Sequence, residues 1–96
     1  MNYIITHAAE KDMLEIQEYI SADNKSAAKK LMGKFKESFR RLAELPEIGY
    51  KKPTWTIRDY KFWNVGKYII AYEIQDRKTI IINRVLSSYR DIISIL

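Results

Sequence analysis

Two adjacent stretches of apolar residues at helical spacing constrain the fold more than any other feature of this sequence. In the first, Ala9, Met13, Ile16 and Ile20 recur at steps of four, three and four, which predicts an amphipathic helix from about Thr6 to Ser21. After a polar turn at 22–24, a second stripe predicts a longer helix that stops before Pro46; it comprises Ala28, Leu31, Phe35, Phe39 and Leu42. Two helices with one apolar face each form a hairpin that must pack against another layer.

The rest of the chain supplies that layer as a sheet. Segments 2–6, 55–64, 68–75 and 79–86 are rich in branched and aromatic residues, as strands are. Segment 76–78 is a short polar connection that suits a hairpin. With 96 residues there is room for one hydrophobic core. We therefore predict a single α+β domain over 1–96, in the order β-α-α-β-β-β, with an antiparallel sheet and the helical hairpin packed on one face.

The predicted sheet is more apolar than one covered face requires. In the last strand Ile80, Ile82 and Leu86 are expected to oppose Ile81 and Val85, so both faces carry large apolar side chains. Two explanations stand side by side. The second face is an exposed interaction surface, or the last apolar residues fold back over it; these are Ile92, Ile93, Ile95 and Leu96.

Arg84 is expected on the strand face that carries Ile80, Ile82 and Leu86. A charge in that position should be paired or functional, because an unpaired buried charge is costly. Asp91 and Glu73 are the two structural partners that the sequence suggests.

Charge is divided unevenly along the chain, whose net charge is +5. Residues 1–24 carry −4, residues 25–41 carry +6 and the remaining 55 residues carry +3. Two neighbouring segments of opposite sign should attract one another if they pack side by side. Part of the basic charge is therefore expected to be structural.

Several functional classes are disfavoured. The chain has no cysteine and one histidine, His7, so we expect neither a disulfide framework nor a metal site. Gly33, Gly49 and Gly66 are too scattered for a phosphate-binding loop, and we expect no cofactor. No apolar run approaches the roughly 20 residues that span a bilayer. A cytoplasmic protein fits this composition.

A mixed basic and aromatic set remains. Cations neutralise phosphates and aromatic rings stack on bases, so such a mixture is typical of single-stranded nucleic-acid binding. Trp55 and Trp63, however, are each more readily explained as core residues. The whole set is Lys51, Lys52, Trp55, Arg58, Tyr60, Lys61, Trp63, Lys67, Arg84, Tyr89 and Arg90.

Several short patterns, in this order, resemble the ParE branch of the RelE/ParE toxins. They are A9-x-x-D12-M-x-x-I16-x-x-Y19-I20, L42-A-E-L-P46-E-I-G49, I57-R58, Y68-I-I-A-Y72-E-I and R84-V85-L86-S-S-Y-R90-D91, and together they cover nearly the whole chain. The fold of that superfamily agrees with the one predicted above.

The resemblance implies a type II toxin that a cognate antitoxin neutralises and that inhibits DNA gyrase by binding to it, without catalysis. It also implies assembly as a homodimer or as a toxin–antitoxin hetero-oligomer. The residues that we expect to contact partners are Arg58, Tyr68, Tyr72, Arg84, Tyr89 and Arg90.

The RelE branch offers an alternative, a metal-independent mRNA endoribonuclease that acts on the ribosome. Its candidate catalytic residues here are Lys51, Lys52, Arg58 and Arg84. Against it, Ile69 stands where RelE-like toxins carry a catalytic arginine, and Ser87 stands where a histidine is usual even in the ParE pattern. The departure at Ser87 leaves a second alternative, a degenerate interaction domain without toxicity.

Overall fold

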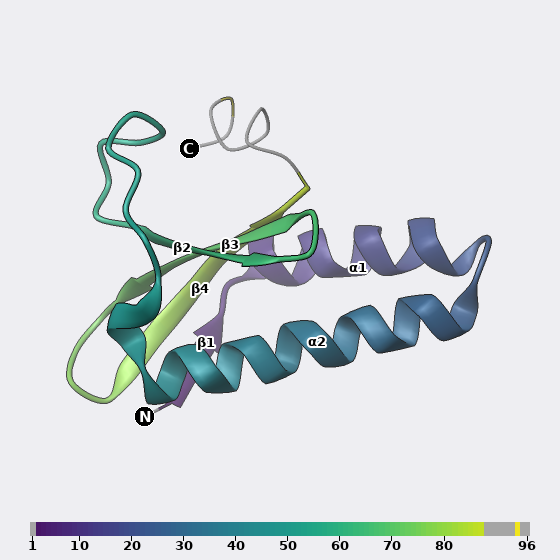
Figure 1. Ribbon diagram of the computed structural model, residues 1–96, viewed down its shortest axis with the longest axis horizontal. Helices are drawn as coiled ribbons and strands as arrows, with labels where there is room; N and C mark the ends of the chain where they lie inside the picture. The colour runs from purple at the N-terminus through teal and green to yellow at the C-terminus, as the bar shows by residue number, and fades with distance from the viewer. Residues whose placement is uncertain (1, 88–93, 95–96) are drawn as a thin grey trace.

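The computed structural model describes residues 2–87 and 94, and it consists of a helical hairpin packed on one face of a sheet (Figure 1). Its elements follow the predicted order β-α-α-β-β-β, with one short 3-10 turn, η1, added after the second helix. They are β1 (Asn2–Ile5), α1 (His7–Ser21), α2 (Lys25–Glu44), η1 (Pro46–Ile48), β2 (Lys61–Val65), β3 (Tyr68–Ile74) and β4 (Thr79–Leu86). Within the described residues no helix has the length and apolarity that a bilayer span requires.

Side-chain caps explain where both helices begin. The Thr6 side chain accepts a hydrogen bond from the Ala9 N–H at 3.1 Å, and the Asn24 side chain accepts one from the Ala27 N–H at 3.0 Å. Each cap satisfies a backbone donor that the first helical turn leaves free. α2 ends one residue before Leu45, which precedes Pro46 and is therefore disfavoured in helical geometry.

The sheet has the strand order β1-β4-β3-β2. β2, β3 and β4 pair antiparallel, as expected of strands joined by short turns. β1 instead runs parallel to β4, with Asn2 opposite Thr79 and Ile5 opposite Ile82. The chain between these two strands comprises the helical hairpin, η1, β2 and β3, so it is much longer than the crossover that a parallel pair requires. The α+β fold with helices on one face is thus confirmed, and the sheet is mixed because of this single parallel pair.

A β-bulge in β4 reverses the predicted orientation of its last residues. Tyr72 lies opposite Ile82 while Ala71 lies opposite Arg84, so Asn83 is an extra residue in the ladder. One extra residue moves all later side chains to the other face. Val85 consequently packs in the core beneath the helices and Leu86 packs on the opposite face, so the prediction that Leu86 shares a face with Ile82 was wrong.

The main core lies between the helical hairpin and the sheet. Its largest fully buried side chains are Tyr72, Phe35, Phe39, Leu42, Ile70, Ile80, Ile82 and Val85. The apolar stripe predicted for α2 is confirmed here, because every large buried residue of that helix belongs to it.

A smaller core covers part of the second sheet face. It contains Phe62, Ile69 and Leu86, and Tyr50 and Trp55 of the segment between η1 and β2 pack against it. Residues 55–60 were predicted as the start of a strand, but they form a loop, and β2 begins only at Lys61. Figure 1 shows this loop rising beside the sheet at the left.

The second face is therefore covered in part, and by a segment that neither sequence explanation named. Ile92, Ile93, Ile95 and Leu96, the other covering residues considered, lie outside the described residues. Ile4 of β1 keeps 52% of its surface exposed, so apolar area remains open beside the covered part.

Candidate functional site

An ion pair between α1 and β4 stands at the end of the sheet. The Arg84 Nε and Nη2 atoms each donate to one oxygen of Asp12, both at 2.7 Å. The Val85 N–H donates to the same carboxylate at 3.0 Å. Hydrogen bonding to Asp12 raises the pKa of Arg84, against the opposing effect of partial burial. Arg84 is thus paired, as a charge in this strand should be, but with Asp12 rather than with either residue suggested by the sequence.

Asp12 and Thr6 together complete the edge of β4 where β1 ends. The Thr6 N–H donates to the Ile82 carbonyl at 3.1 Å, and its hydroxyl donates to the Asn83 carbonyl at 2.9 Å. The Asp12 carboxylate accepts a hydrogen bond from the Val85 N–H. The start of α1 therefore replaces a strand partner for the bulged part of β4.

A shallow pocket of about 490 Å³ opens beside this ion pair, and we call it the α1–β4 groove. Ile16 and Tyr19 line it from α1, while Tyr68 and Leu86 line it from the sheet. Tyr19 is 78% exposed, so a large aromatic side chain stands free at the rim. The remaining lining residues are Asp12, Glu15, Lys67, Arg84, Val85 and Ser87. Apolar area with charges of both signs around it suits an amphipathic protein segment.

The loop between η1 and β2 forms a second exposed surface. Ile57 is fully exposed at 104% and is followed by Arg58, whose side chain lies over the Tyr60 ring and donates to the Tyr60 hydroxyl at 3.3 Å. Lys52 lies over the rings of Tyr50 and Trp55, 6.0 and 5.8 Å from their centroids. The loop thus exposes one isoleucine and two cations, and both cations lie over aromatic rings.

Two of the predicted partner-binding residues are buried, namely Tyr72 and Tyr68. Tyr72 has no exposed surface; its hydroxyl donates to the Pro46 carbonyl at 2.6 Å and accepts from the Gly49 N–H at 2.9 Å. The structure therefore gives Tyr72 a packing role. Tyr68 is 6% exposed, and Lys67 lies over its ring. Tyr89 and Arg90 lie outside the described residues.

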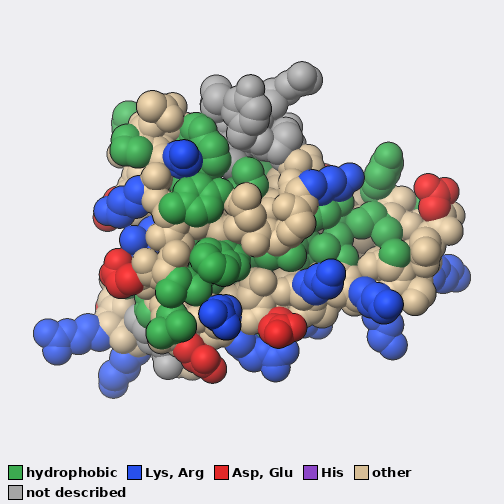
Figure 2. Space-filling model, viewed as in Figure 1, with side chains coloured by type: hydrophobic (Ala, Val, Ile, Leu, Met, Phe, Trp, Pro, Cys, Tyr) green, Lys and Arg blue, Asp and Glu red, His purple; other side chains and the backbone are tan. Residues whose placement is uncertain are grey.

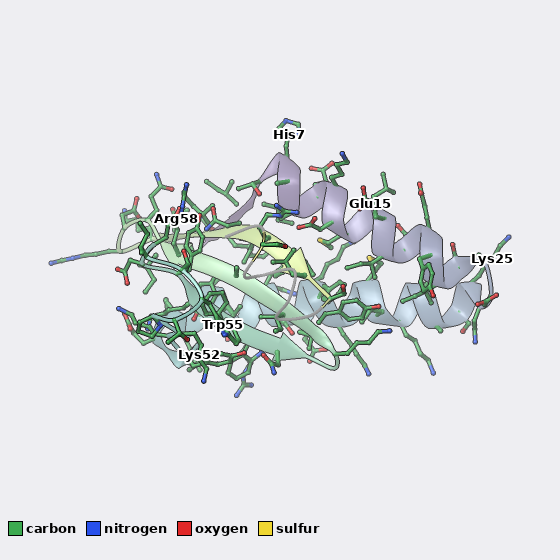
Figure 3. The ribbon with its side chains drawn as sticks, turned by 90° about the horizontal axis from the view of Figure 1, so that it is seen from above. His7, Glu15, Lys25, Lys52, Trp55 and Arg58 are labelled. Atoms are coloured by element: carbon green, nitrogen blue, oxygen red, sulfur yellow. The ribbon has the colours of Figure 1, made fainter. Side chains whose placement is uncertain are left out.

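The four candidate catalytic cations of the endoribonuclease alternative each contact different residues. Lys51 pairs with Asp59 at 2.8 Å, and hydrogen bonding in that exposed pair raises the pKa of Lys51. Arg84 pairs with Asp12, on another element. Figure 3 shows His7 at the start of α1, pointing away from the body of the molecule and from the loop that carries Lys52 and Arg58. Among the described residues no cluster of histidine and carboxylate side chains could hold a metal ion.

The sequence as a whole fits a known family. The family described as "ParE toxin of type II toxin-antitoxin system, parDE" matches residues 3–92. The chain belongs to the ParE toxin family. The match includes both helices, all four strands except the first residue of β1, and the two surfaces described above.

The fold of this ParE-family chain also occurs in a solved structure. A chain of the "Chromosomal ParDE TA system from P. aeruginosa" superposes with a TM-score of 0.74, covering 92% of this chain and 96% of that one. The two sequences are 17% identical, so this likeness establishes the shared fold. No curated protein sequence matches the chain at a significant level.

Sequence reasoning missed the role of Asp12, although a signal for it was present. On a helix, Asp12 lies three residues after Ala9 and four before Ile16, at the border of the apolar stripe that packs on the sheet. A carboxylate at such a border requires a partner from the neighbouring layer. The covering role of Tyr50 and Trp55 had a weaker signal, since the segment that begins at Trp55 was predicted to be a strand.

Proposed function

We propose that this ParE-family protein is the toxin of a type II toxin–antitoxin system, that a cognate antitoxin neutralises it, and that it acts by binding and inhibiting DNA gyrase. The single observation that supports binding over catalysis is the separate engagement of the candidate catalytic cations. Arg84 is held by Asp12 in a partly buried two-point ion pair and is therefore not free to stabilise charge on a reacting phosphate, while Lys51 lies on another element in an exposed pair with Asp59.

The α1–β4 groove is the surface that we assign to the antitoxin. Tyr19 and Leu86 supply apolar area there, while Glu15 and Lys67 supply charges of opposite sign at the rim. A partner segment that folds upon binding would insert apolar side chains between them. Aromatic residues at the centre of such interfaces commonly carry much of the binding energy.

A binding measurement with the product of a neighbouring reading frame tests this assignment. Tyr19→Ala should weaken the complex by at least about tenfold, or about 1.4 kcal/mol. Leu14→Ala is the matched control, because Leu14 is also an exposed apolar residue of α1 but does not line the groove. Equal losses in both variants would contradict the assignment.

The loop surface around Ile57 and Arg58 is the surface that we assign to gyrase. It lies on a different element from the groove, and its two exposed residues follow one another in the sequence. Purified protein at micromolar concentration should block supercoiling by gyrase. Arg58→Ala should reduce that inhibition, whereas Arg77→Ala, which removes an exposed arginine from the turn between β3 and β4, should not.

The endoribonuclease alternative has its own readout. Primer extension on mRNA translated in the presence of the protein would reveal cuts at fixed positions in the ribosomal A site. Such cuts together with unimpaired supercoiling would replace the gyrase proposal. Normal growth after induced expression, with neither effect, would favour the non-toxic interaction domain.

A further inference from the structure

The whole excess of positive charge in this chain lies on α2. The helix carries seven Lys and Arg residues and two Glu residues, a net charge of +5, while the other 76 residues carry ten cations and ten acids. The seven cations are Lys25, Lys29, Lys30, Lys34, Lys36, Arg40 and Arg41. The chain is therefore neutral apart from one helix.

This charge is not used inside the protein. We expected the acidic residues of α1 to neutralise part of it, but the ion pairs of residues 2–87 join Lys51 to Asp59, Lys61 to Glu47 and Arg84 to Asp12. All seven cations of α2 are exposed. Figure 2 shows Lys and Arg side chains projecting from the lower part of the molecule, where Figure 1 places α2. The positive charge is available to a partner.

The seven cations form two rows on opposite flanks of the helix. Lys30, Lys34 and Arg41 are spaced by four and seven residues, and the last two line a hollow beside β2. The other row has spacings of four, seven and four, and its last residue lines a hollow beside β1; it consists of Lys25, Lys29, Lys36 and Arg40. At a rise of about 1.5 Å per residue the rows extend over about 16 and 22 Å.

This face lacks the features that other partners require. The exposed large apolar residues of the described chain lie outside α2, so a protein partner or a lipid bilayer would find no anchor on it. They are Ile4, Leu14, Tyr19, Leu45, Ile57 and Ile74. The face also has no exposed aromatic ring on which a single-stranded base could stack.

We propose that the exposed face of α2 binds the phosphate backbone of double-stranded DNA. A helix about 10–12 Å in diameter fits the major groove of B-form DNA, which is about 12 Å wide, whereas the deep and narrow major groove of double-stranded RNA excludes it. Two rows of cations on opposite flanks can then reach the phosphates on either side of the groove. Phosphate contacts carry no sequence information, so the binding is sequence-independent and sensitive to salt.

Fluorescence anisotropy with a labelled 20-base-pair DNA duplex of arbitrary sequence tests the proposal. If about six phosphates are contacted, affinity should fall by roughly a thousandfold between about 50 and 200 mM salt. The variant K30Q/K34Q/R41Q should bind at least about tenfold more weakly and should lower the salt slope by about 3. K29Q/K36Q/R40Q, on the other row, should behave in the same way.

The matched control is K11Q/R77Q/K78Q, which removes the same charge from exposed positions outside α2. It should retain nearly all of the affinity. Circular dichroism should show wild-type helix content in all three variants, because glutamine and lysine have similar helix propensities. An equal loss in the control would overturn the proposal, since net charge alone would then explain the binding.

Equally tight binding to double-stranded RNA or to phosphatidylglycerol vesicles would also overturn it. The proposal does not rest on gyrase as the target. A protein that binds DNA through α2 and leaves supercoiling intact would refute the proposed function and support this inference, and inhibition without DNA binding would do the reverse.

Discussion

Arg84 of β4 and Asp12 of α1, which are 72 positions apart in the chain, meet in a two-point ion pair with both N–O distances at 2.7 Å. The same carboxylate accepts the Val85 N–H. One side chain thereby neutralises a partly buried cation and satisfies the edge of a strand at its bulge. The first helix is fixed to the last strand at the wall of the α1–β4 groove.

Asp12→Ala should destabilise the protein by about 2–3 kcal/mol, because it leaves Arg84 unpaired and a backbone donor unsatisfied. This is at or below the lower end of the range of about 3–5 kcal/mol that is usual when a buried ion pair loses one partner, because 24% of the Arg84 side chain is exposed. Urea unfolding measures the change. Glu18→Ala, which removes an exposed acid from the same helix, should cost less than about 0.5 kcal/mol. Similar losses in both variants would contradict this account.

Gly49→Ala should also destabilise the fold, because a Cβ atom at this position would overlap the Tyr72 hydroxyl and lie 2.7 Å from its Cε1 atom. The Tyr72 ring is fully buried and cannot move aside without disturbing the core. We expect a loss of about 1–3 kcal/mol. Thermal unfolding of the variant beside the wild type checks it, and an unchanged midpoint would show that the ring can shift at little cost.

Gly33→Ala should have the opposite effect. This glycine lies within α2, and an added Cβ atom would meet nothing within 4 Å. Alanine is favoured over glycine in a helix interior by about 1 kcal/mol. The variant should therefore be more stable by about that amount in urea unfolding. A loss of stability would reveal a packing requirement that the described residues do not contain.

Stability should fall at high pH partly through Tyr72. Burial raises the pKa of Tyr72 above its ordinary value of 10.0, although the hydrogen bond from Gly49 opposes the change. The folded protein then holds this proton more tightly than the unfolded chain. The contribution is complete below about pH 10 and is lost as pH rises through the folded-state pKa.

Tyr72→Phe tests this dependence. It should cost about 1–2 kcal/mol at neutral pH, since two hydrogen bonds to the hydroxyl are lost. Its disadvantage relative to the wild type should shrink as pH rises above about 10. Tyr19→Phe, at an exposed position, should keep the wild-type dependence. A constant gap between Tyr72→Phe and wild type would contradict the expectation.

Features set by short stretches of sequence were predictable, and features set by contacts between layers were not. The caps at Thr6 and Asn24, the apolar stripe of α2 and its end before Pro46 follow from local spacing and backbone geometry. The bulge at Asn83 has no local signal, because 79–86 reads as one uninterrupted strand. It forms where β1 ends and α1 takes over the edge of β4.

The candidate site divides in the same way. That Arg84 needs a partner could be predicted from its place in an apolar strand, but the identity of that partner depends on how α1 crosses the sheet. Tyr72 was expected to contact a partner because of the family resemblance, and an aromatic residue in a strand carries no mark of which layer will cover it. Its burial follows from the packing of α2 and η1 against β3.

In the loop between η1 and β2, one residue covers the sheet and another is available to a partner. Trp55 packs against Phe62 at a centroid distance of 5.0 Å and against Tyr50 at 6.2 Å, whereas Ile57 is fully exposed. Trp55→Ala should lower the free energy of unfolding by about 2 kcal/mol and expose the second sheet face to a hydrophobic dye. The loss is smaller than for a core tryptophan because the Trp55 ring is only partly buried.

Ile57→Ala should leave the free energy of unfolding within about 0.5 kcal/mol of the wild type and yet weaken inhibition of gyrase. Unfolding and supercoiling measured on both variants check this, and Ile57→Ala protein with full inhibitory activity would remove the loop from the proposed gyrase surface.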